Sequence, residues 1–549
     1  MIALGISGAF GHDAAACLLQ DGCVLAMAEE ERFTRRRHAH DALPVNALRF
    51  CLAQGGVSPA DIDVIAFGWN PRLQPRYGGL QAFGERVLRL DELRGARRMT
   101  VEWVDHHRAH AASAYFGSGF EAAAVLVIDG QGEAASTSWG AGHGRALSLQ
   151  GQLPIAASLG HFYRASTRYV GFPEFAEGKF MGLAAYGRVL DVESPIVLTR
   201  EGCHFRFFEG RADVERIEYA EIQDATHRWL AAHVGDSGAE AGWRSRQAGG
   251  TAGLRSNAAD VAATVTRFLS DAILHLAGLA VAAAGSRRLA LAGGVALNCT
   301  ANGRILRSGL VDELYIAPAA NDAGSALGAA MDACARAGFA SRLDRIDLGP
   351  DFTDEQMRHA ASAAGLNLMR LGEDLADATA RLIATGATVG WFQGRMEIGP
   401  RALGFRSTLC AADSIASRDR MNDVKGRERW RPLAPAILAE HVSSLAEGLA
   451  DSPYMLLAAS ATPIAQRLVP GVVHADGTMR VQSVLPGSGI YRQVIEAVHQ
   501  RTGVPAIVNT SFNPAGAPIV CTPADAVAAF ARGGLDALVL GPYMLLRDS

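Results

Sequence analysis

IALGIS at residues 2–7, followed by GAFGHD at 8–13 and AAACLL at 14–19, opens the chain. A QDG turn at 20–22 and the apolar run CVLAMA at 23–28 come next. Short apolar runs separated by Gly and Asp turns are typical of neighbouring strands joined by tight connections. The stretch therefore predicts strand, glycine turn, strand, Asp-Gly turn and strand.

The same plan recurs at Val125–Trp139, around Asp129-Gly130-Gln131-Gly132. A third glycine element, in which Gly293 and Gly294 follow an apolar strand, lies within Leu289–Asn298. Glycine at such a bend lets backbone N–H groups approach a nucleotide closely. Two opening hairpins in one chain resemble the paired lobes of the actin-like (ASKHA) fold of sugar kinases and Hsp70. We therefore expect an α/β, actin-like, two-lobed N-terminal domain over residues 1–350.

A candidate metal site lies at Asp105-His106-His107-Arg108-Ala109-His110, which begins an alanine-rich helix. His106 and His110 are four residues apart, so they share one helix face and can bind a single ion. His107 is turned about 100° away around a helix of ~3.6 residues per turn, so we leave it out. For the pair alone, two solvated histidines on a surface helix are the alternative.

Two aspartates strengthen the metal interpretation. Asp129 ends the apolar run Ala122–Ile128, and Asp322 lies in Asn321-Asp322-Ala323-Gly324. A carboxylate at the end of a buried strand, followed by glycines, is where α/β folds place chemistry. Two His with two Asp favour a mid-series divalent ion, iron(II) before manganese, over structural zinc.

Composition limits the class of protein. A chain of 549 residues is too long for one core, so two or three domains are expected. The net charge of −4 argues against a general nucleic-acid binder. Eight scattered cysteines without a C-x-x-C pair predict a reduced cytoplasmic protein. Met1–Leu19 lacks the features of a signal peptide, and charges within Ala258–Gly285 predict a buried amphipathic helix, not a membrane span.

Two further segments bear on the N-terminal domain. Glu177-Gly178-Lys179 and the nearby Gly182 follow the hairpins, and a surface ion pair is the alternative interpretation of Glu177 and Lys179. Residues 209–257 are polar with little periodicity and are interpreted as an insertion with one or two helices. A domain boundary is expected near 345–357, where a Gly-Pro pair breaks the helical pattern.

A basic segment marks the second domain, expected over residues 358–549. From Arg395 to Arg431 there are nine basic residues against five acidic ones. Lys425, Arg427, Arg429 and Arg431 alternate, so all four would face one side if the segment is extended. Converging cations suit a small polyanion such as a pair of phosphates. A solvated basic edge strand is the alternative.

These motifs together resemble the O-carbamoyltransferases of the nodulation-protein NodU and antibiotic-tailoring (cephamycin, tobramycin, ansamycin) family. The resemblance covers nearly the whole chain. The segments that carry it are Gly11-His12-Asp13, His106–His110, Ile128-Asp129-Gly130, Glu177-Gly178-Lys179, Leu291–Asn298, Asn321–Gly324, Gly390–Gly404, Lys425–Pro432 and Asn509–Asn513.

The resemblance implies a TsaD-like actin-fold domain followed by a YrdC-like α/β domain. The second domain would make carbamoyl-adenylate from carbamoyl phosphate and ATP with Mg²⁺, releasing pyrophosphate. The first would transfer the carbamoyl group to an alcohol of a small molecule, such as a natural product or a sugar. The protein is expected to act without nucleic acid or membrane, and a homodimer is compatible with the sequence.

The resemblance also assigns residues by motif position. His12 would be the general base on the acceptor hydroxyl. The metal, usually iron, would be held by His106, His110, Asp129 and Asp322. Carbamoyl-adenylate would be bound in the first domain by Glu177, Lys179, Gly182, Gly293, Gly294 and Asn298. Carbamoyl phosphate and ATP would be bound in the second by Arg395, Arg401, Lys425, Arg427, Arg431, Arg480, Asn509 and Ser511.

Two departures from the family pattern are visible. Phe405 occupies a position where Asn is usual, and Ala517 one where Gly-Glu-Pro is usual. Either could alter a loop near the adenylation site. Two other functions fit parts of the sequence: a tRNA threonylcarbamoyladenosine-type modifying enzyme, and an actin-like kinase or ATPase that would leave the second domain unexplained.

Overall fold

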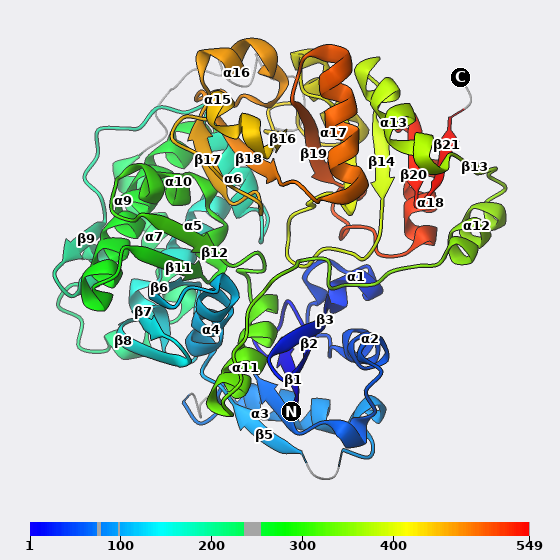
Figure 1. Cartoon of the computed structure of the whole chain (residues 1–549). Helices are drawn as coiled ribbons and strands as arrows, with labels where there is room; N and C mark the ends of the chain where they lie inside the picture. Colours follow the sequence, from blue (N-terminus) through cyan, green and yellow to red (C-terminus); the bar gives the residue numbers. More distant parts are fainter. Residues whose placement is uncertain (74–77, 97–98, 235–253, 548–549) are drawn as a thin grey trace. The chain divides into compact units, whose positions relative to one another are not determined.

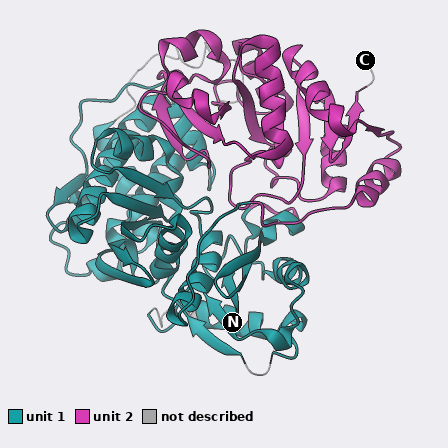
Figure 2. Cartoon of the chain, in the orientation of Figure 1, with its two compact units in different colours: residues 1–34, 38–243, 253–346 teal, residues 35–37, 244–252, 347–549 magenta. Residues whose placement is uncertain are grey.

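The computed structural model describes residues 1–73, 78–96, 99–234 and 254–547 (Figure 1). Within those residues the chain forms two compact units, coloured separately in Figure 2. Of the described residues, those within 1–34, 38–234 and 254–346 belong to unit 1, and those within 35–37 and 347–547 belong to unit 2. The predicted assignment of separate activities to residues 1–350 and 358–549 stays a prediction.

The first sheet of unit 1 has the strand order β3-β2-β1-β4-β5. Strands β1, β2 and β3 run antiparallel, as the opening sequence predicts, whereas β4 and β5 are parallel to β1. The strands are β1 (Ile2–Ser7), β2 (Ala15–Gln20), β3 (Cys23–Glu29), β4 (Val64–Phe67) and β5 (Thr100–Trp103).

The second sheet of unit 1 repeats this plan in the order β12-β11-β6-β7-β8. Strands β6, β7 and β8 run antiparallel, and β11 and β12 are parallel to β6. The strands are β6 (Ala122–Ile128), β7 (Ala135–His143), β8 (Ala146–Pro154), β11 (Arg288–Ala292) and β12 (Glu313–Ile316). Two sheets with one shared topology make unit 1 the two-lobed, actin-like domain that the paired hairpins predict.

Two alanine-rich helices connect the sheets. Helix α11 (Ala323–Arg336) packs on β1, β2 and β4, while α4 (His106–Ser118) packs on β6 and β11. The two helices also pack on each other, and small residues allow their backbones to approach closely. A Cβ on Gly328 of α11 would lie 1.7 Å from the carbonyl oxygen of Ala109 in α4, a distance that only glycine avoids.

The remaining helices of unit 1 surround the two sheets. They are α1 (Glu30–Thr34), α2 (Val45–Gly55), α3 (Gly78–Leu88), α5 (Leu159–Tyr169), α6 (Glu177–Ala184), α7 (Tyr219–His233), α9 (Ala258–Ala284) and α10 (Cys299–Arg307). A two-stranded ribbon, β9 (Ile196–Thr199) with β10 (Gly202–Phe205), completes the unit. Helix α7 lies in the predicted insertion 209–257, of which residues 235–253 fall outside the described residues.

Helix α9 is long and apolar enough to cross a membrane, judged by length and composition alone. It packs against α6, α10 and strands β6 and β7, and many of its side chains are buried there. The predicted amphipathic core helix over this segment is therefore present.

Unit 2 is built on one mixed nine-stranded sheet in the order β13-β21-β20-β14-β15-β19-β16-β18-β17. Its strands are β13 (Met369–Arg370), β14 (Val389–Phe392), β15 (Arg406–Ala411), β16 (Ala434–Leu438), β17 (Leu457–Ser460), β18 (Thr478–Val484), β19 (Ala506–Ser511), β20 (Ala537–Leu540) and β21 (Tyr543–Leu546). Its helices are α12 (Asp354–Ala363), α13 (Leu375–Ala384), α14 (Ile415–Val424), α15 (Val442–Leu445), α16 (Pro463–Leu468), α17 (Gly489–Thr502) and α18 (Pro523–Ala531).

The core of unit 2 lies on both faces of this sheet. Helices α13 and α17 pack on one cluster of buried side chains that includes Trp391 and Val539, and α12 and α18 pack on another that includes Phe392 and Leu538. The predicted fold class is confirmed as an α/β chain in which an actin-like two-lobed unit is followed by a second α/β unit.

The close contact of α4 and α11 yields a stability prediction. Gly328→Ala should lower the melting temperature of unit 1, because the new methyl group must displace the backbone of α4, and overpacking costs about 1–3 kcal/mol or more. Gly278→Ala in α9 is the matched control, because no atom lies within 4 Å of its added Cβ and alanine favours helix. Differential scanning calorimetry of both variants measures the effect; equal melting temperatures would contradict the proposed packing.

Candidate functional site

Four side chains of unit 1 converge where strands of both sheets end. Asp129 follows β6 directly, and Asp322 is the N-cap residue of α11, after β12. His106 and His110 lie in the first turns of α4, whose N-cap Asp105 accepts a hydrogen bond from the Arg108 N–H group. The local sequence thus sets each side chain on the end of an element, and the α4–α11 crossing brings the elements together.

The distances within this His/Asp cluster are short. The Nε2 atoms of His106 and His110 are 3.1 Å apart. Asp129 Oδ2 lies 3.3 Å from His106 Nε2 and 3.6 Å from His110 Nε2. Asp322 Oδ1 lies 3.7 Å and 3.8 Å from the same two nitrogens. All four side chains are buried, and one ligand atom from each lies within 4.8 Å of the others.

Neighbouring groups fix the orientation of these ligands. His106 Nδ1 lies 2.9 Å from the carbonyl oxygen of Gly68, so it donates there and Nε2 is the nitrogen that faces the cluster. Asp129 Oδ1 accepts a hydrogen bond of 2.9 Å from the Gly294 N–H group. His107 points elsewhere, with Nδ1 2.9 Å from Ser138 Oγ, in agreement with its exclusion from the predicted ligands.

The opposite charges in the cluster shift one another's pKa values toward the ionised forms. Burial alone would lower the pKa of His106, but the Asp322 and Asp129 carboxylates outweigh burial and raise the pKa well above its usual range. Burial would likewise raise the pKa of Asp129, yet the two histidines hold it well below its usual range. Two carboxylates facing two imidazole nitrogens form a donor set that fits a divalent ion of the middle of the first transition series.

His12 lies beside this cluster, in the turn after β1. Its Nδ1 is 3.4 Å from Asp13 Oδ2 and 3.8 Å from Asp322 Oδ2. Burial would lower the pKa of His12, but the Asp322 and Asp13 carboxylates outweigh it and raise the pKa to about 9. The sequence-predicted base is therefore adjacent to one of the predicted metal ligands.

The predicted glycine bend also reaches the cluster. Gly293 has a φ of +88°, and a Cβ there would lie 2.3 Å from the Ile128 carbonyl oxygen, so only glycine fits between β11 and β6. Gly294 contacts Asp129, as described above. Asn298 caps α10 by accepting a hydrogen bond from the Ala301 N–H group.

The other predicted adenylate residues lie on α6. Glu177 Oε1 is 3.3 Å from Arg164 Nε. Glu177 therefore forms an ion pair, as its alternative interpretation expects, and its partner in that pair is Arg164. Gly182 is buried, and the adjacent Met181 Sδ lies 4.0 Å from Cys299 Sγ at the start of α10. Helix α6 is thus close to Asn298, whereas Lys179 is only half-buried.

In unit 2 the predicted cations form a second centre. Lys425, at the end of α14, donates to the Ser511 carbonyl oxygen and, over 2.7 Å, to Asn513 Oδ1. Burial, followed by repulsion from Arg427 and Arg431, lowers the pKa of Lys425 well below its usual range. This ammonium is buried among other cations and held by neutral oxygen atoms.

Arg427, Arg431 and Arg480 extend this centre. Burial and then the charges of Arg431 and Arg480 lower the pKa of Arg427 to about 9, despite the nearby Glu428. Arg427 Nε donates to Asn422 Oδ1 over 2.6 Å, while its buried Nη2 has no hydrogen-bond partner among the described residues. These three half-buried arginines beside the buried Lys425 are a group of cations of the kind that binds anions, and their role as phosphate ligands stays a prediction.

The other predicted residues of unit 2 have structural contacts. Arg395 Nη2 donates to the Leu348 carbonyl oxygen over 2.6 Å, so its guanidinium holds the chain at the start of the unit. Asn509 Nδ2 donates to the carbonyl oxygen of Ala402 over 3.0 Å, next to Arg401. Ser511 Oγ donates to Asn513 Oδ1 over 2.6 Å and thereby helps to hold the loop that Lys425 contacts.

The period-two prediction for the basic segment is wrong. Residues after Lys425 form turns, not a strand, because Gly426 has a φ of +59° and the Arg427 N–H group bonds back to the Asn422 carbonyl oxygen. Arg429 consequently points to solvent and pairs with Asp423 at 2.7 Å.

Phe405 and Ala517, the two departures from the family pattern, lie near predicted phosphate-binding residues in the sequence and make backbone hydrogen bonds in unit 2. The Phe405 carbonyl oxygen accepts a hydrogen bond from Arg406 Nη1 over 3.1 Å. The Phe405 N–H group donates to Glu397 Oε1 over 3.4 Å. The Ala517 carbonyl oxygen accepts from Asn513 Nδ2 over 2.6 Å. At both positions these hydrogen bonds use backbone atoms, which any residue type supplies. The two departures therefore do not remove a predicted ligand.

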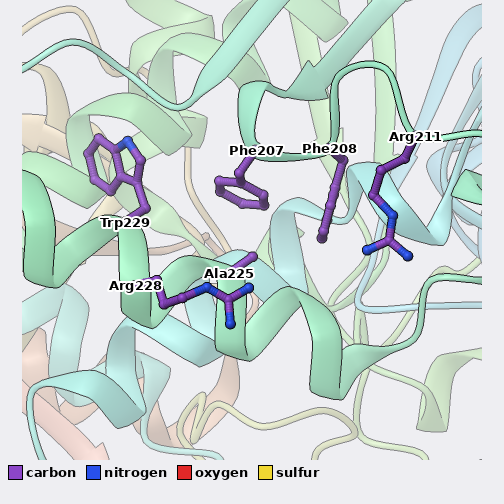
Figure 3. A pocket seen from close by; sticks show the side chains of 6 residues that line it. All are labelled: Phe207, Phe208, Arg211, Ala225, Arg228 and Trp229. Carbon is purple, nitrogen blue, oxygen red and sulfur yellow. The ribbon is translucent and has the colours of Figure 1, made fainter.

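A separate hollow of about 340 Å³ lies in unit 1 and is shown in Figure 3. Its lining consists of Phe207, Phe208, Arg211, Ala225, Arg228 and Trp229, none of which belongs to a predicted site. Arg211 is already paired with Asp213 at 2.6 Å. We assign no role to this hollow.

Comparison with known protein families supplies the context for the two centres. A family model described as the carbamoyltransferase N-terminus matches residues 2–78 and 80–331, and one described as the carbamoyltransferase C-terminus matches residues 380–547. The chain belongs to the carbamoyltransferase family. The predicted enzyme class, a carbamoyltransferase, is thereby confirmed.

Curated relatives of this carbamoyltransferase cover most of its length. An uncharacterised protein of Synechocystis sp., sll1178, is 35% identical over 100% of this chain and 97% of that protein. Nodulation protein NolNO of Sinorhizobium fredii is 35% identical over 99% of this chain and 80% of that protein. Nodulation protein U of Rhizobium tropici is 29% identical over 96% of this chain and 93% of that protein.

Solved structures match the carbamoyltransferase more distantly. HypF from T. kodakarensis is 14% identical, covers 61% of this chain and 47% of that chain, and has a TM-score of 0.36. P. abyssi Sua5 complexed with L-threonine is 18% identical, covers 32% of this chain and 48% of that chain, and has a TM-score of 0.25.

Sequence reasoning missed several groups around the His/Asp cluster. Glu133 is buried and accepts hydrogen bonds from the N–H groups of His106 and Asn70. Asp13 and His38 form a hydrogen bond of 2.9 Å beside His12. Asp13 follows His12 directly in a quoted motif and could have been found there; His38 and Glu133 carry no local signal, because only tertiary folding brings them to the cluster.

The cluster geometry predicts that His110 is needed for metal binding. His110→Ala should abolish stoichiometric binding of iron(II) or manganese, because it removes one of two facing nitrogen ligands. His107→Asn is the matched control on the same helix and should keep its metal, because His107 faces Ser138. Equilibrium dialysis followed by elemental analysis decides the matter: full metal content in His110→Ala would remove His110 from the ligand set.

Proposed function

We propose that this carbamoyltransferase is an ATP-dependent O-carbamoyltransferase. In unit 2, water releases inorganic phosphate from carbamoyl phosphate, and an oxygen of the resulting carbamate attacks the α-phosphorus of ATP with Mg²⁺, so that carbamoyl-adenylate forms and pyrophosphate leaves. Unit 1 transfers the carbamoyl group to a hydroxyl group of a small molecule. A natural product or a sugar is the acceptor class, and action in the cytoplasm without nucleic acid stays part of the proposal.

One observation carries the proposal: unit 1 gathers carboxylates that face histidines, whereas unit 2 gathers cations that face one another. Unit 1 buries the carboxylates of Asp129 and Asp322 against histidines. Unit 2 holds the buried Lys425 beside the half-buried Arg427, and burial, followed by repulsion between cations, lowers the pKa of both. An excess of buried cations suits the phosphates of ATP and carbamoyl phosphate, whereas a His₂Asp₂ donor set suits a divalent ion.

The order of the two half-reactions follows from the chemistry of the carbamoyl group. A carbamate is a poor electrophile, because its nitrogen and oxygen donate electrons to the carbonyl carbon. Joining it to AMP supplies a good leaving group. The acceptor oxygen then forms a bond to the carbamoyl carbon, the bond from that carbon to the AMP phosphate oxygen breaks, and the hydroxyl proton must go to a base.

The residues of the His/Asp cluster fit a bound iron(II) or manganese ion. His106 and His110 would supply nitrogen ligands, and Asp129 and Asp322 would supply oxygen ligands. Such an ion would offset negative charge on the adenylate and on the developing oxyanion. The buried carbonyl and N–H partners of these residues, at Gly68 and Gly294, would hold the ligands in one orientation.

His12 is the proposed base for the acceptor hydroxyl. A base must be unprotonated, and the Asp322 and Asp13 carboxylates at present raise the pKa of His12 to about 9. A cation held by Asp322 would compensate one of these carboxylates and so lower the pKa of His12 toward neutrality. Metal binding and the basicity of His12 are therefore linked through Asp322.

The cation centre predicts a defect in the first half-reaction. Arg427→Gln should slow carbamoyl-phosphate-dependent pyrophosphate release by about 10- to 150-fold, which corresponds to about 1.5–3 kcal/mol for one lost charge-assisted contact. Arg429→Gln should release pyrophosphate at the parental rate, because Arg429 pairs with Asp423 at the surface. If both variants keep the parental rate, the cation centre does not bind the phosphates.

The position of His12 predicts a defect in the second half-reaction. His12→Gln should still form carbamoyl-adenylate, but carbamoyl transfer to an alcohol should fall by about 10²–10⁴-fold, the usual contribution of a general base. Supplied carbamoyl-adenylate should restore product formation in Arg427→Gln but not in His12→Gln. Equal loss of both half-reactions in His12→Gln would instead indicate a structural role.

A further inference from the structure

The imidazole of His12 needs a defined orientation to act as the proposed base. Its Nδ1 faces Asp13 Oδ2 at 3.4 Å and Asp322 Oδ2 at 3.8 Å. When His12 is neutral, the ring nitrogen that faces carboxylate oxygens keeps the proton, so the lone pair lies on Nε2. Asp13 is the nearer of the two carboxylates, although the contact is an ion-pair distance and not a hydrogen bond. An aspartate in this place can set the tautomer and the direction of the ring, as it does for a catalytic histidine in hydrolase triads.

Asp13 is itself held on both carboxylate oxygens. His38 Nδ1 lies 2.9 Å from Oδ1, and Asn321 Nδ2 donates to Oδ2 over 3.1 Å. The Asp13 N–H group donates to the His38 carbonyl oxygen over 2.7 Å. His38 thus forms hydrogen bonds to Asp13 through both its backbone carbonyl group and its side chain.

The backbone around this contact is strained. Asp13 has a φ of +53°, His38 of +60° and Ala39 of +43°, which is the left-handed region that side chains other than Asn, Asp and Gly rarely adopt. Such residues persist only where their surroundings over-determine them. For His38 those surroundings are the Glu31 carboxylate, which accepts from the His38 N–H group over 2.7 Å, and the ring of Phe175.

Phe175 packs against the rings of both His38 and His12. Its ring stacks on His38 at 4.3 Å between centroids and meets the edge of His12 at 5.3 Å. Arg164 covers the Phe175 ring at 4.8 Å, and Phe175 has itself a φ of +57°. One strained phenylalanine therefore contacts both histidines.

We propose that His38 is a positioning residue, which orients His12 through Asp13 for carbamoyl transfer. The proposal rests on the base role of His12 in the proposed function. An asparagine would fit the left-handed backbone better, so conformation alone does not account for a histidine at this position. A histidine supplies in addition the ring that stacks on Phe175, while its Nδ1 makes the same hydrogen bond that an Asn Nδ2 could make.

Three substitutions separate the hydrogen bond from the backbone. His38→Gly relieves the left-handed strain but removes the donor to Asp13. His38→Asn keeps a tolerated backbone and places an amide N–H group where Nδ1 lies. His40→Ala is the matched control, since the His40 ring lies 5.2 Å from that of Phe175 and makes no hydrogen bond to Asp13 among the described residues.

The experiment uses the metal-loaded full-length enzyme, supplied carbamoyl-adenylate and methanol as the probe alcohol, and it measures methyl carbamate by mass spectrometry. His38→Gly should lower the rate constant for transfer by about 10²-fold, the effect of a misplaced reacting group. His38→Asn should recover the parental rate constant within about threefold, and His40→Ala should retain it. Pyrophosphate release should stay parental in all three variants.

The outcomes are distinguishable. Equal slowing in His38→Gly and His38→Asn, or parental transfer in His38→Gly, would overturn the positioning role of His38. His12→Gln measured in parallel tests the base role: if it transfers at the parental rate, the proposed function loses its base and the positioning role falls with it. Should His38→Gly fail to fold, Asp13→Asn, which keeps shape and suits a φ of +53°, is expected to show the same loss of transfer.

Discussion

Alanine and glycine line the crossing of α4 and α11, where the backbones come so close that a Cβ on Gly328 would meet the Ala109 carbonyl oxygen. Each helix packs on a different sheet of unit 1. The crossing therefore sets the two histidines of α4 beside the N-terminal Asp322 of α11. Larger side chains at the crossing would hold the helices farther apart. The His/Asp cluster depends on this contact, because its ligand atoms come from both helices.

Burial of charge is the second constraint. Carboxylates and imidazoles in a low-dielectric place destabilise the fold unless each has a partner, and apolar residues of similar size would often be more favourable. Asp129 has such partners in the Gly294 N–H group and in the histidines. The cations of unit 2 face neutral oxygen atoms and one another, and burial followed by their mutual repulsion lowers the pKa values of Lys425 and Arg427. A phosphate group would relieve this repulsion, so the binding energy of the anion is partly the relief of strain in the protein.

Local pattern was sufficient to predict the strands and the His/Asp cluster. Apolar runs between glycine turns identified β1 to β3, and the spacing of His106 and His110 placed both on one face of α4. The basic segment after Lys425 failed, because a period of two assumes a strand and Gly426 instead begins a turn. Contacts such as Asp13 with His38 had no local signal at all. They arise only when the segment after α1 folds back on the turn after β1.

Strain in this carbamoyltransferase is not spread evenly. Of the eight residues other than glycine with positive φ in the described part of the chain, Asp13, His38, Ala39, Asp41 and Phe175 belong to the surroundings of His12. Each such residue costs about 1–2 kcal/mol. Glycine at these positions would stabilise the chain locally, yet it would remove the side chains that hold Asp13. Stability and the orientation of His12 are therefore opposed in this segment, as is common where a protein stores strain for catalysis.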